Sequence, residues 1–304
     1  MARVLVTGGT GFVGMPTLQA LVESGEEVHA LSTSAAPPEV AGVTWHQGDL
    51  GVQGGVDQLL RDLSPERLVH LAWYVEHGRF WQAPENVEWV ERSLGLLRRF
   101  VDAGGRRAVL LGTCAEYDWS AAEGPLNETD TPLGPTTLYG VAKDSLHRVC
   151  ATYAGNVGLE LAWGRLFFLY GPREAPGRLV SSVARSLLAG ERVDTTEGSQ
   201  IRDFLHVGDV GGALAALAGS SVVGPVNIAS GEPITIAAVI DRIAAATGRA
   251  DLLNRGALPG RPDDPTSLVA DVSRLRDEVG FTPGISMDAG IAATVEWWRA
   301  QGPT

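Results

Sequence analysis

The chain has 304 residues, of which 44% are hydrophobic and 20% are charged. This balance is typical of a globular protein and argues against disorder, and the length fits one domain or two closely joined domains. The net charge of −12 argues against nucleic acid and anionic membrane surfaces as partners.

Membrane insertion, disulfide bonding and metal binding are also disfavoured. No segment approaches the ~20 apolar residues that a helix needs to span a bilayer, and the first residues, MARVLVTGG, hold a single strand-length apolar run. The two cysteines, Cys114 and Cys150, are too few for a disulfide framework, and the six histidines lack metal-ligand spacing. We therefore expect a cytoplasmic protein with reduced thiols and no metal site.

The first half of the chain alternates between short apolar runs and helical patterns. Apolar runs predict strands at residues 4–6, 27–31, 43–46, 67–72 and 108–112. Helical spacing predicts helices at residues 16–24, 59–63 and 86–103, the last of which stops at Gly104 and Gly105. This alternation predicts the α/β class, a doubly wound parallel sheet of Rossmann type with helices on both faces.

After an apolar strand at residues 161–169 the pattern loosens into longer loops marked by prolines. We expect a dinucleotide-binding domain at residues 1–169 and a smaller C-terminal substrate-binding lobe at residues 170–304. Segments near 203–228, namely 204–210 and 226–228, are expected to return to the main sheet.

The run VLVTGGTGFVG places Gly8, Gly11 and Gly14 directly after a strand and at the start of a helix. This spacing gives a tight turn and lets the backbone approach a pyrophosphate, whose charge the helix N-terminus then faces. With Phe12 and Val13 between them, these glycines predict a dinucleotide site, although such glycines also occur in ordinary loops.

The end of the second strand determines the form of the cofactor. An NAD site usually places Asp or Glu there, but this chain has Ser32 and, two residues on, Ser34. Hydroxyls without a carboxylate favour NADP(H), although NAD(H) stays possible because no arginine is nearby; alternatively, the serines form a solvated turn. Asp49 is placed to touch the adenine amino group or, equally well, to cap a helix.

Further contacts with the cofactor are expected beside these positions. The residues concerned follow Asp49 or lie at the end of the fourth strand, namely Leu50, Leu71, Ala72 and Trp73.

The run LYGVAKD places Tyr139 and Lys143 four residues apart, which puts both on one face of a helix. An ammonium group beside a phenol lowers the pKa of the phenol, so that Tyr139 can exchange a proton with substrate. Thr113 lies at the end of the fifth strand, where its hydroxyl can orient Tyr139. Each motif also has a plainer explanation, a surface helix pair or a structural threonine.

Together these motifs resemble the extended short-chain dehydrogenase/reductase family, particularly its nucleotide-sugar epimerases, dehydratases and 4-ketoreductases. TGGTGFVG, VHLAW, LLGTCAEY, LYGVAK, RLFFLYGP, IRDFLHVGDV and ADVSRLRDEVGFTP all have family counterparts. The resemblance implies catalytic roles for Thr113, Tyr139 and Lys143, a nucleotide-diphosphate-sugar substrate and a homodimer. The dimer would pair helix 86–103 and the Tyr139 helix with their copies.

The departures from the family pattern narrow the range of reactions that the resemblance implies. Family 4,6-dehydratases carry Asp-Glu after the catalytic threonine, whereas this chain has Cys114 and Ala115, which cannot serve as acid and base. Phe168 replaces an asparagine that often touches the substrate diphosphate. Arg202 and Arg261 match positions that hold the diphosphate, unless they are ordinary surface arginines.

Substrate contacts are expected just beyond the fourth and fifth strands. Tyr74 belongs to an aromatic group with Trp73, Phe80 and Trp81 that lines a sugar pocket or packs at the lobe interface. Cys114 is expected to form a pocket wall, and Glu116 to reach the substrate.

The sequence thus favours an NADP(H)-dependent 4-ketoreductase of a nucleotide-linked 4-keto-6-deoxyhexose. The alternatives are a nucleotide-sugar 4-epimerase with tightly bound NAD and a non-catalytic dinucleotide-sensing protein. For the dimer, Trp89, Val90 and Leu97 leave apolar surface beyond what the sheet needs, unless they lie beneath the loop at residues 74–84.

Overall fold

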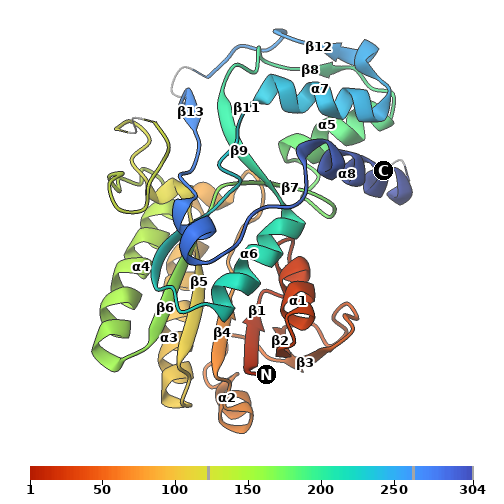
Figure 1. Cartoon of the computed structure of the whole chain (residues 1–304). Coiled ribbons are helices and arrows are strands. Elements are labelled where there is room, and N and C mark those ends of the chain that lie inside the picture. Colours follow the sequence, from red (N-terminus) through yellow and green to blue (C-terminus); the bar gives the residue numbers. More distant parts are fainter. Residues whose placement is uncertain (122–123, 262–263, 303–304) are drawn as a thin grey trace.

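The computed structural model describes residues 1–302 except 122–123 and 262–263. Its largest element is a seven-stranded parallel sheet in the order β10-β6-β5-β4-β1-β2-β3 (Figure 1). The strands are β1 (Arg3–Thr7), β2 (Glu27–Ser32), β3 (Val43–Gln47), β4 (Arg67–His70), β5 (Arg107–Thr113), β6 (Glu160–Leu166) and β10 (Gly224–Ile228).

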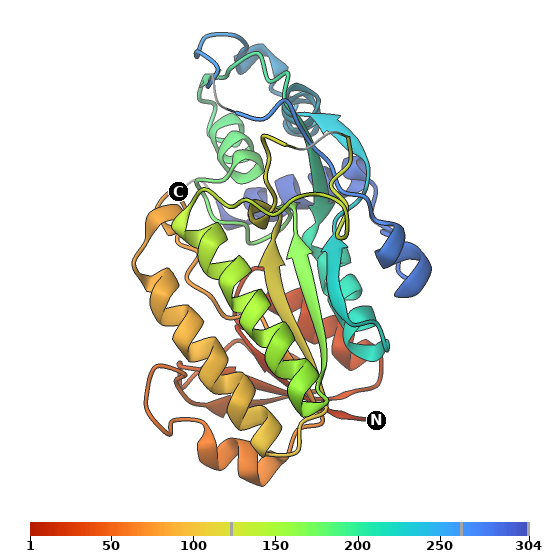
Figure 2. The same cartoon turned by 90° about the vertical axis from the view of Figure 1, so that its left-hand side faces the viewer.

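Both faces of this sheet are covered by helices, because successive side chains of a strand point to opposite faces. Val4 and Val6 pack with α1 (Gly14–Glu23) and α6 (Val207–Gly219). Leu5 packs in a separate core with α2 (Asp57–Leu63), α3 (Glu85–Asp102) and α4 (Leu138–Val157). Figure 2 shows α3 and α4 lying side by side on that second face. The expected doubly wound α/β fold is confirmed.

A smaller lobe lies beyond the carboxyl ends of the main strands (Figure 1). Its small sheet contains β7 (Phe168–Tyr170), β9 (Ile201–His206), β11 (Pro233–Thr235) and β13 (Ser267–Leu268). A third core joins this sheet to α5 (Leu179–Leu188), α7 (Ile236–Thr247) and α8 (Met287–Gln301). The short strands β8 (Val193–Asp194) and β12 (Leu253–Asn254) pair at the far end.

The two segments that were expected to return to the main sheet behave differently. Residues 226–228 lie in β10, which pairs with β6 at the edge of that sheet. Residues 204–206 instead belong to β9 in the small sheet, and α6 begins directly after them, capped by the His206 ring. The apolar run at residues 204–210 gave no sign of the change from strand to helix, because β9 is buried and so is most of α6.

A buried carboxylate ties the small sheet to the main one. Asp203 of β9 accepts hydrogen bonds from the backbone N–H groups of Gly231 and Ala270 and from both the N–H and the hydroxyl of Ser230. Ser230 and Gly231 follow directly after β10. Since an unpaired buried polar group is costly, this set of donors fixes the lobe over the carboxyl edge of the sheet.

Within the described part of the chain, every helix is too short or too polar to cross a membrane.

Candidate active site

The glycine turn between β1 and α1 leaves no room for side chains. Gly8 has φ +75°, and a Cβ atom there would lie 2.6 Å from the backbone nitrogen of Ala72. A Cβ atom on Gly14 would overlap the Gly8 carbonyl oxygen and lie 2.6 Å from the carbonyl carbon of Gly9. In the described structure no side chain caps the N-terminus of α1. The N–H groups of Met15 and Thr17 donate to the Gly11 and Val13 carbonyl oxygens, so an anion such as a pyrophosphate would be attracted by the positive end of the helix dipole rather than by a row of free N–H groups.

A cavity of about 830 Å³ runs from this turn to the lobe. Its wall contains most of the residues that the sequence predicted for the cofactor and the reaction, which makes it a fitting site for a dinucleotide. These residues are Gly8, Gly11, Phe12, Val13, Gly14, Ser32, Asp49, Leu50, Leu71, Ala72, Trp73, Thr113, Tyr139 and Lys143.

At the far end of β2, the wall carries hydroxyl groups. Ser32 and Thr33 line the cavity, whereas Ser34 lies outside it and donates its backbone N–H to the Ser32 hydroxyl. Asp49 also lines the cavity and accepts the N–H of Gly51 at 2.7 Å. The alternative role of Asp49 as a helix cap is wrong, because α2 starts only at Asp57.

Sequence reasoning missed Arg92, a cation on the same wall. It lies on α3, and a Cβ atom on Gly51 would be 3.1 Å from its guanidinium carbon and 3.2 Å from a carboxylate oxygen of Asp49. Arg92 also donates to Glu88 at 2.7 Å. The residue belongs to a different helix from the serines of β2, so only the fold brings them to one cavity.

Tyr139 lies in the first turn of α4, which Thr137 caps by accepting the N–H of Gly140. The rings of Phe80 and Trp81 meet the Tyr139 ring edge-on, with centroids at 5.0 and 5.9 Å. The expected lowering of the Tyr139 pKa by Lys143 is corrected: burial raises the pKa of Tyr139, and the group that acts in the opposite direction is the Thr113 side chain, through its hydrogen bond. The structure thus brings Thr113 and Tyr139 together as the sequence predicted.

Lys143, one helical turn further on, is 4% exposed. Its ammonium group donates to the Leu111 carbonyl oxygen at 2.8 Å and lies 3.6 Å from the centre of the Trp73 ring. The Trp73 indole is held by the side chain of buried Asn86 at 2.9 Å. Burial lowers the pKa of Lys143 to about 7, while the charge of Glu116 acts to raise it.

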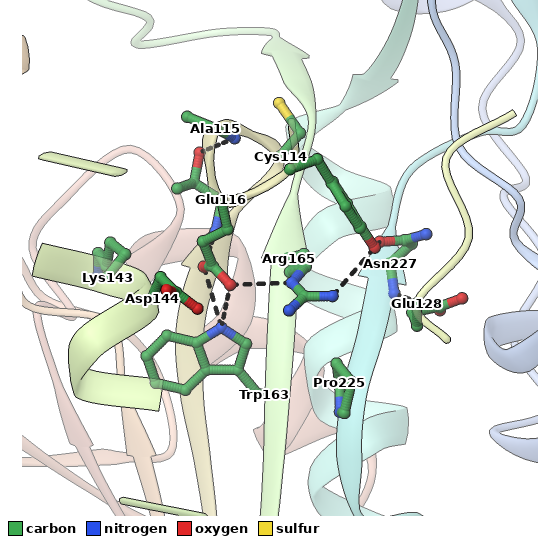
Figure 3. Close-up of polar contacts among 12 residues, drawn as sticks. Cys114, Ala115, Glu116, Glu128, Lys143, Asp144, Trp163, Arg165, Pro225 and Asn227 are labelled. Carbon is green, nitrogen blue, oxygen red and sulfur yellow. Dashed lines mark hydrogen bonds and ion pairs between the residues drawn. The ribbon is translucent and has the colours of Figure 1, made fainter. Parts of the chain in front are cut away.

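The residues that follow Thr113 have two roles: Cys114 lines the cavity, and Glu116 supports the Thr113 turn from behind. Cys114 lines the cavity, and burial raises the pKa of its thiol to about 12, which keeps it neutral. Glu116 is fully buried, and its oxygens accept the Thr113 N–H, the Trp163 indole N–H and the Arg165 guanidinium (Figure 3). The expectation that Glu116 reaches the substrate is therefore corrected, because protein groups occupy its carboxylate.

The aromatic residues beyond β4 differ in whether they line the cavity. Trp73, Phe80 and Trp81 line the cavity. Tyr74 lies off the wall, and its hydroxyl donates to Glu76 at 2.6 Å. The expected contact of Tyr74 with substrate is therefore not supported by its position.

The two arginines expected at a diphosphate have different positions. Arg202 is 5% exposed, lines the cavity and donates to Asp264 at 2.5 Å and to the Pro265 carbonyl oxygen at 2.9 Å. Its guanidinium lies 5.5 Å from the centre of the Phe168 ring, which occupies the wall in place of the family asparagine. Arg261 is exposed and lies off the cavity wall.

Two further charged residues on the wall were not predicted. Glu174 and Arg178 come from the loop between β7 and α5. Glu174 is 3% exposed and accepts the N–H of Ser181 at 3.0 Å, and burial raises the pKa of this carboxyl to about 7. A charge in a proline-rich loop carries no sequence signal for the direction in which it will point.

Comparison with known proteins places the chain among nucleotide-sugar enzymes. A sequence model described as "NAD dependent epimerase/dehydratase family" matches residues 4–229. A UDP-glucose 4-epimerase of Streptomyces lividans is 28% identical, with 99% of this chain and 97% of the relative covered.

Solved structures extend the same likeness. The UDP-glucose 4-epimerase of Thermus thermophilus in complex with NAD is 27% identical, with a TM-score of 0.84 and coverage of 98% of this chain and 99% of that one. MoeE5 in complex with UDP-glucose and NAD is 31% identical, with a TM-score of 0.83 and the same coverage.

The glycine turn gives a direct test of the cofactor site. Gly14→Ala places a methyl group against the backbone of Gly8 and Gly9, and overpacking of this kind typically costs about 1–3 kcal/mol. We expect dinucleotide affinity, measured by calorimetric titration, to fall by about tenfold or more. Gly155→Ala is the matched control, since a Cβ there meets no atom within 4 Å. Equal affinities in the two variants would place the cofactor elsewhere.

Proposed function

We propose that this chain, which belongs to the NAD dependent epimerase/dehydratase family, is an NADP(H)-dependent 4-ketoreductase of a nucleotide-linked 4-keto-6-deoxyhexose. The observation that carries the proposal is the set of ionisable groups at the reaction centre. Tyr139, Lys143 and the Thr113 hydroxyl share the cavity wall, whereas the next residue, Cys114, is a neutral thiol. Ala115 has no ionisable group, so an acid–base pair for removing water is missing after Thr113.

Each residue of this set has a distinct role. The phenol of Tyr139 donates a proton to the C4 oxygen, which the Thr113 hydroxyl holds in position. The ammonium of Lys143 binds the nicotinamide ribose. When bound, the reduced nicotinamide supplies the hydride. Because burial raises the pKa of Tyr139, the phenol is protonated at neutral pH, which suits reduction better than proton abstraction from an alcohol.

The preference for NADP(H) rests on the charges at the end of β2. Ser32 and Thr33 offer hydroxyl groups there, where an NAD site usually has a carboxylate. Arg92 adds a positive charge near Asp49 on the same wall. The end of β2 thus offers hydroxyl groups and a nearby guanidinium to a 2′-phosphate in place of the usual carboxylate.

The substrate end of the cavity is suited to an anionic nucleotide sugar in an acidic protein. Arg202 and Arg178 provide positive charge on the wall. Planar guanidinium groups bind diphosphate oxygens in pairs. On the same wall, the Trp81 and Phe204 rings offer an apolar surface for a 6-methyl group.

A nucleotide-sugar 4-epimerase is the second candidate, and the UDP-glucose 4-epimerases among the relatives favour it. It would use the same Thr113, Tyr139 and Lys143. An epimerase keeps its NAD and needs no added reductant, whereas a reductase consumes one NADPH for each product. A dinucleotide-sensing protein without activity is disfavoured, because it would not need this complete set.

The protein acts in the cytoplasm as a homodimer that pairs α3 and α4 with their copies. Val87 of α3 and Val141 and Val149 of α4 are 61%, 43% and 51% exposed, an apolar surface consistent with an isologous interface. Of the residues that the sequence predicted for this surface, Leu97 is buried in the core beneath α3, Val90 is partly buried against that core, and Trp89 packs against Trp73 with ring centroids at 6.2 Å.

Replacing the proton donor tests the mechanism. Tyr139→Phe should lower the rate of NADPH oxidation with a nucleotide-linked 4-keto-6-deoxyhexose by roughly 10²–10⁴-fold, the usual range for a lost acid–base group. Dinucleotide binding and the unfolding midpoint should stay close to wild type. A turnover number near that of the wild type would eliminate Tyr139 as the donor.

A second variant tests the form of the cofactor. Ser32→Asp should move the ratio of kcat/KM from NADPH towards NADH, because a carboxylate repels a 2′-phosphate and binds free ribose hydroxyls. Ser34 lies outside the cavity wall, so Ser34→Asp is the matched control and should leave the ratio of kcat/KM for the two cofactors unchanged. If the wild type already prefers NADH strongly, NADP(H) is the wrong assignment and the epimerase gains support.

The assembly is tested by placing a charge on α4. Val149→Glu should convert the dimer to a monomer in analytical ultracentrifugation at micromolar concentration, because the interface would bury an unpaired carboxylate. Val223→Glu, at a valine of similar exposure (49%) in the loop before β10, should leave the dimer intact. A monomeric wild type would refute the interface.

A further inference from the structure

A cluster of buried polar side chains lies directly behind Thr113, on the side away from the cavity. Figure 3 shows Glu116, Trp163 and Arg165 at its centre, between α4 and the strands β5 and β6. Glu116 and Arg165 are 0% and 1% exposed, and the Arg165 Nε atom lies 2.9 Å from Glu116 Oε2. This ion pair is therefore removed from solvent.

Glu116 binds the backbone of the catalytic segment. Its Oε1 atom accepts the Thr113 N–H at 2.8 Å, while the Thr113 hydroxyl accepts the N–H of Ala115 at 3.2 Å. These reciprocal hydrogen bonds form a capping box around the turn at residues 113–116. The turn packs closely on α4, since a Cβ atom on Gly140 would lie 2.6 Å from the Ala115 carbonyl oxygen. Glu116 thus fixes the strand end that carries Thr113 relative to the helix turn that carries Tyr139.

The remaining hydrogen bonds of the cluster hold Glu116 in place. The Trp163 indole donates to both carboxylate oxygens at 3.0 and 3.1 Å. Arg165 also donates to the Tyr117 hydroxyl at 3.1 Å, which donates in turn to the Asn227 side chain at 2.8 Å. The cluster therefore links the turn to β6 and to the edge strand β10.

Folding alone does not require such a pair. Replacing a buried ion pair by apolar residues of similar volume is often neutral or stabilising. The position of Glu116 suggests a use for its charge, because that charge raises the pKa of Lys143 against the effect of burial. An ammonium group that binds a ribose must stay protonated at the working pH.

The other groups around Lys143 do not replace this charge. Burial and the nearby ammonium of Lys143 lower the pKa of His70 to about 3, so its ring is neutral. Asp144, the next residue of α4, pairs with Arg148 at 3.0 Å. The titratable and charged groups around Lys143 and the cluster are His70 on β4, Cys114 and Glu116 after β5, Tyr139, Asp144 and His147 on α4, and Arg165 on β6. The His147 ring stacks on Trp163, and burial lowers its pKa to about 4, so it is neutral as well.

We propose that Glu116 is a positioning residue, which holds the Thr113 turn against α4 through its backbone hydrogen bond and places a buried negative charge near the Lys143 ammonium. This inference rests on the proposed roles of Thr113, Tyr139 and Lys143. Burial raises the pKa of the Glu116 carboxyl, whereas the Arg165 ion pair and the Trp163 hydrogen bond act in the opposite direction; Arg165 and Trp163 therefore favour the ionised carboxylate and fix its position.

Two double variants separate the contributions of shape and charge. Glu116→Gln with Arg165→Met keeps an oxygen acceptor for the Thr113 N–H but removes the charge. Glu116→Met with Arg165→Met removes both. Arg107→Met is the stability control, since Arg107 lies on the same strand β5 at its other end and donates to the Leu217 and Ala218 carbonyl oxygens.

Dinucleotide affinity is measured by calorimetric titration as a function of pH, and kcat is measured in parallel. Removing the Glu116 charge lowers the pKa of Lys143, so affinity should begin to fall at a lower pH in both double variants than in the wild type. The Met/Met variant should also lose kcat, by up to about 10²-fold, because the Thr113 hydroxyl is no longer held. Arg107→Met should lower the unfolding midpoint without moving the pH profile.

A wild-type pH profile of affinity in the folded Gln/Met variant would overturn the charge part of the proposal. Unchanged kcat in the folded Met/Met variant would overturn the positioning part. If the Met/Met variant fails to fold, kcat of the Gln/Met variant decides the positioning part: a value near wild type at low pH supports it, and a loss like that of Tyr139→Phe contradicts it. The affinity profile needs no turnover, so failure of the ketoreductase assignment would leave it measurable.

Discussion

Lys143 carries its ammonium group into the protein at the carboxyl edge of a parallel sheet, where it is 4% exposed. A buried cation needs close partners, and here they come from separate elements: the Leu111 carbonyl of β5, the Trp73 face after β4 and the charge of Glu116. Because each partner is fixed by its own strand, the geometry of the reaction centre depends on the order β6-β5-β4-β1 in the sheet.

The same edge explains the shape of the cavity. Only glycine fits at Gly8, where the turn lies against residues 71–72 after β4, and at Gly14, where α1 begins against the backbone of Gly8 and Gly9. Asp203 fixes the lobe over this edge through backbone and hydroxyl donors that follow β10 and β13. One wall is therefore built by the sheet and the other by the lobe, and together they enclose the space in which the dinucleotide and the sugar meet.

Sequence patterns predicted the parts of this structure that depend on local spacing. The glycine turn, the strand-helix alternation and the pair Tyr139 and Lys143 each lie within about ten residues and follow from backbone geometry. They did not predict that β9 would leave the main sheet, because a buried strand reads as an apolar run in either sheet.

Contacts between segments that are far apart in the sequence also could not be predicted. Glu116 was expected at the substrate because it follows Thr113, yet Arg165 and Trp163, nearly fifty residues further on, turn it inward. Arg92 and Glu174 reach the cavity from elements whose sequences carry no signal of that direction. Which side of a turn a charge faces is set by its partner, and partners far apart in sequence cannot be paired from one chain alone.

Transfer of deuterium from the cofactor to the sugar tests the proposed 4-keto reduction. The purified protein would be incubated with a nucleotide-linked 4-keto-6-deoxyhexose and NADPH deuterated at nicotinamide C4, on the face that the enzyme uses, and the sugar product analysed by NMR. The proposed reductase should give one deuterium at C4 of the sugar and one NADP⁺ for each product molecule. Conversion of a 4-hydroxy nucleotide sugar into its epimer without NADPH oxidation, and with no deuterium in the sugar, would contradict it.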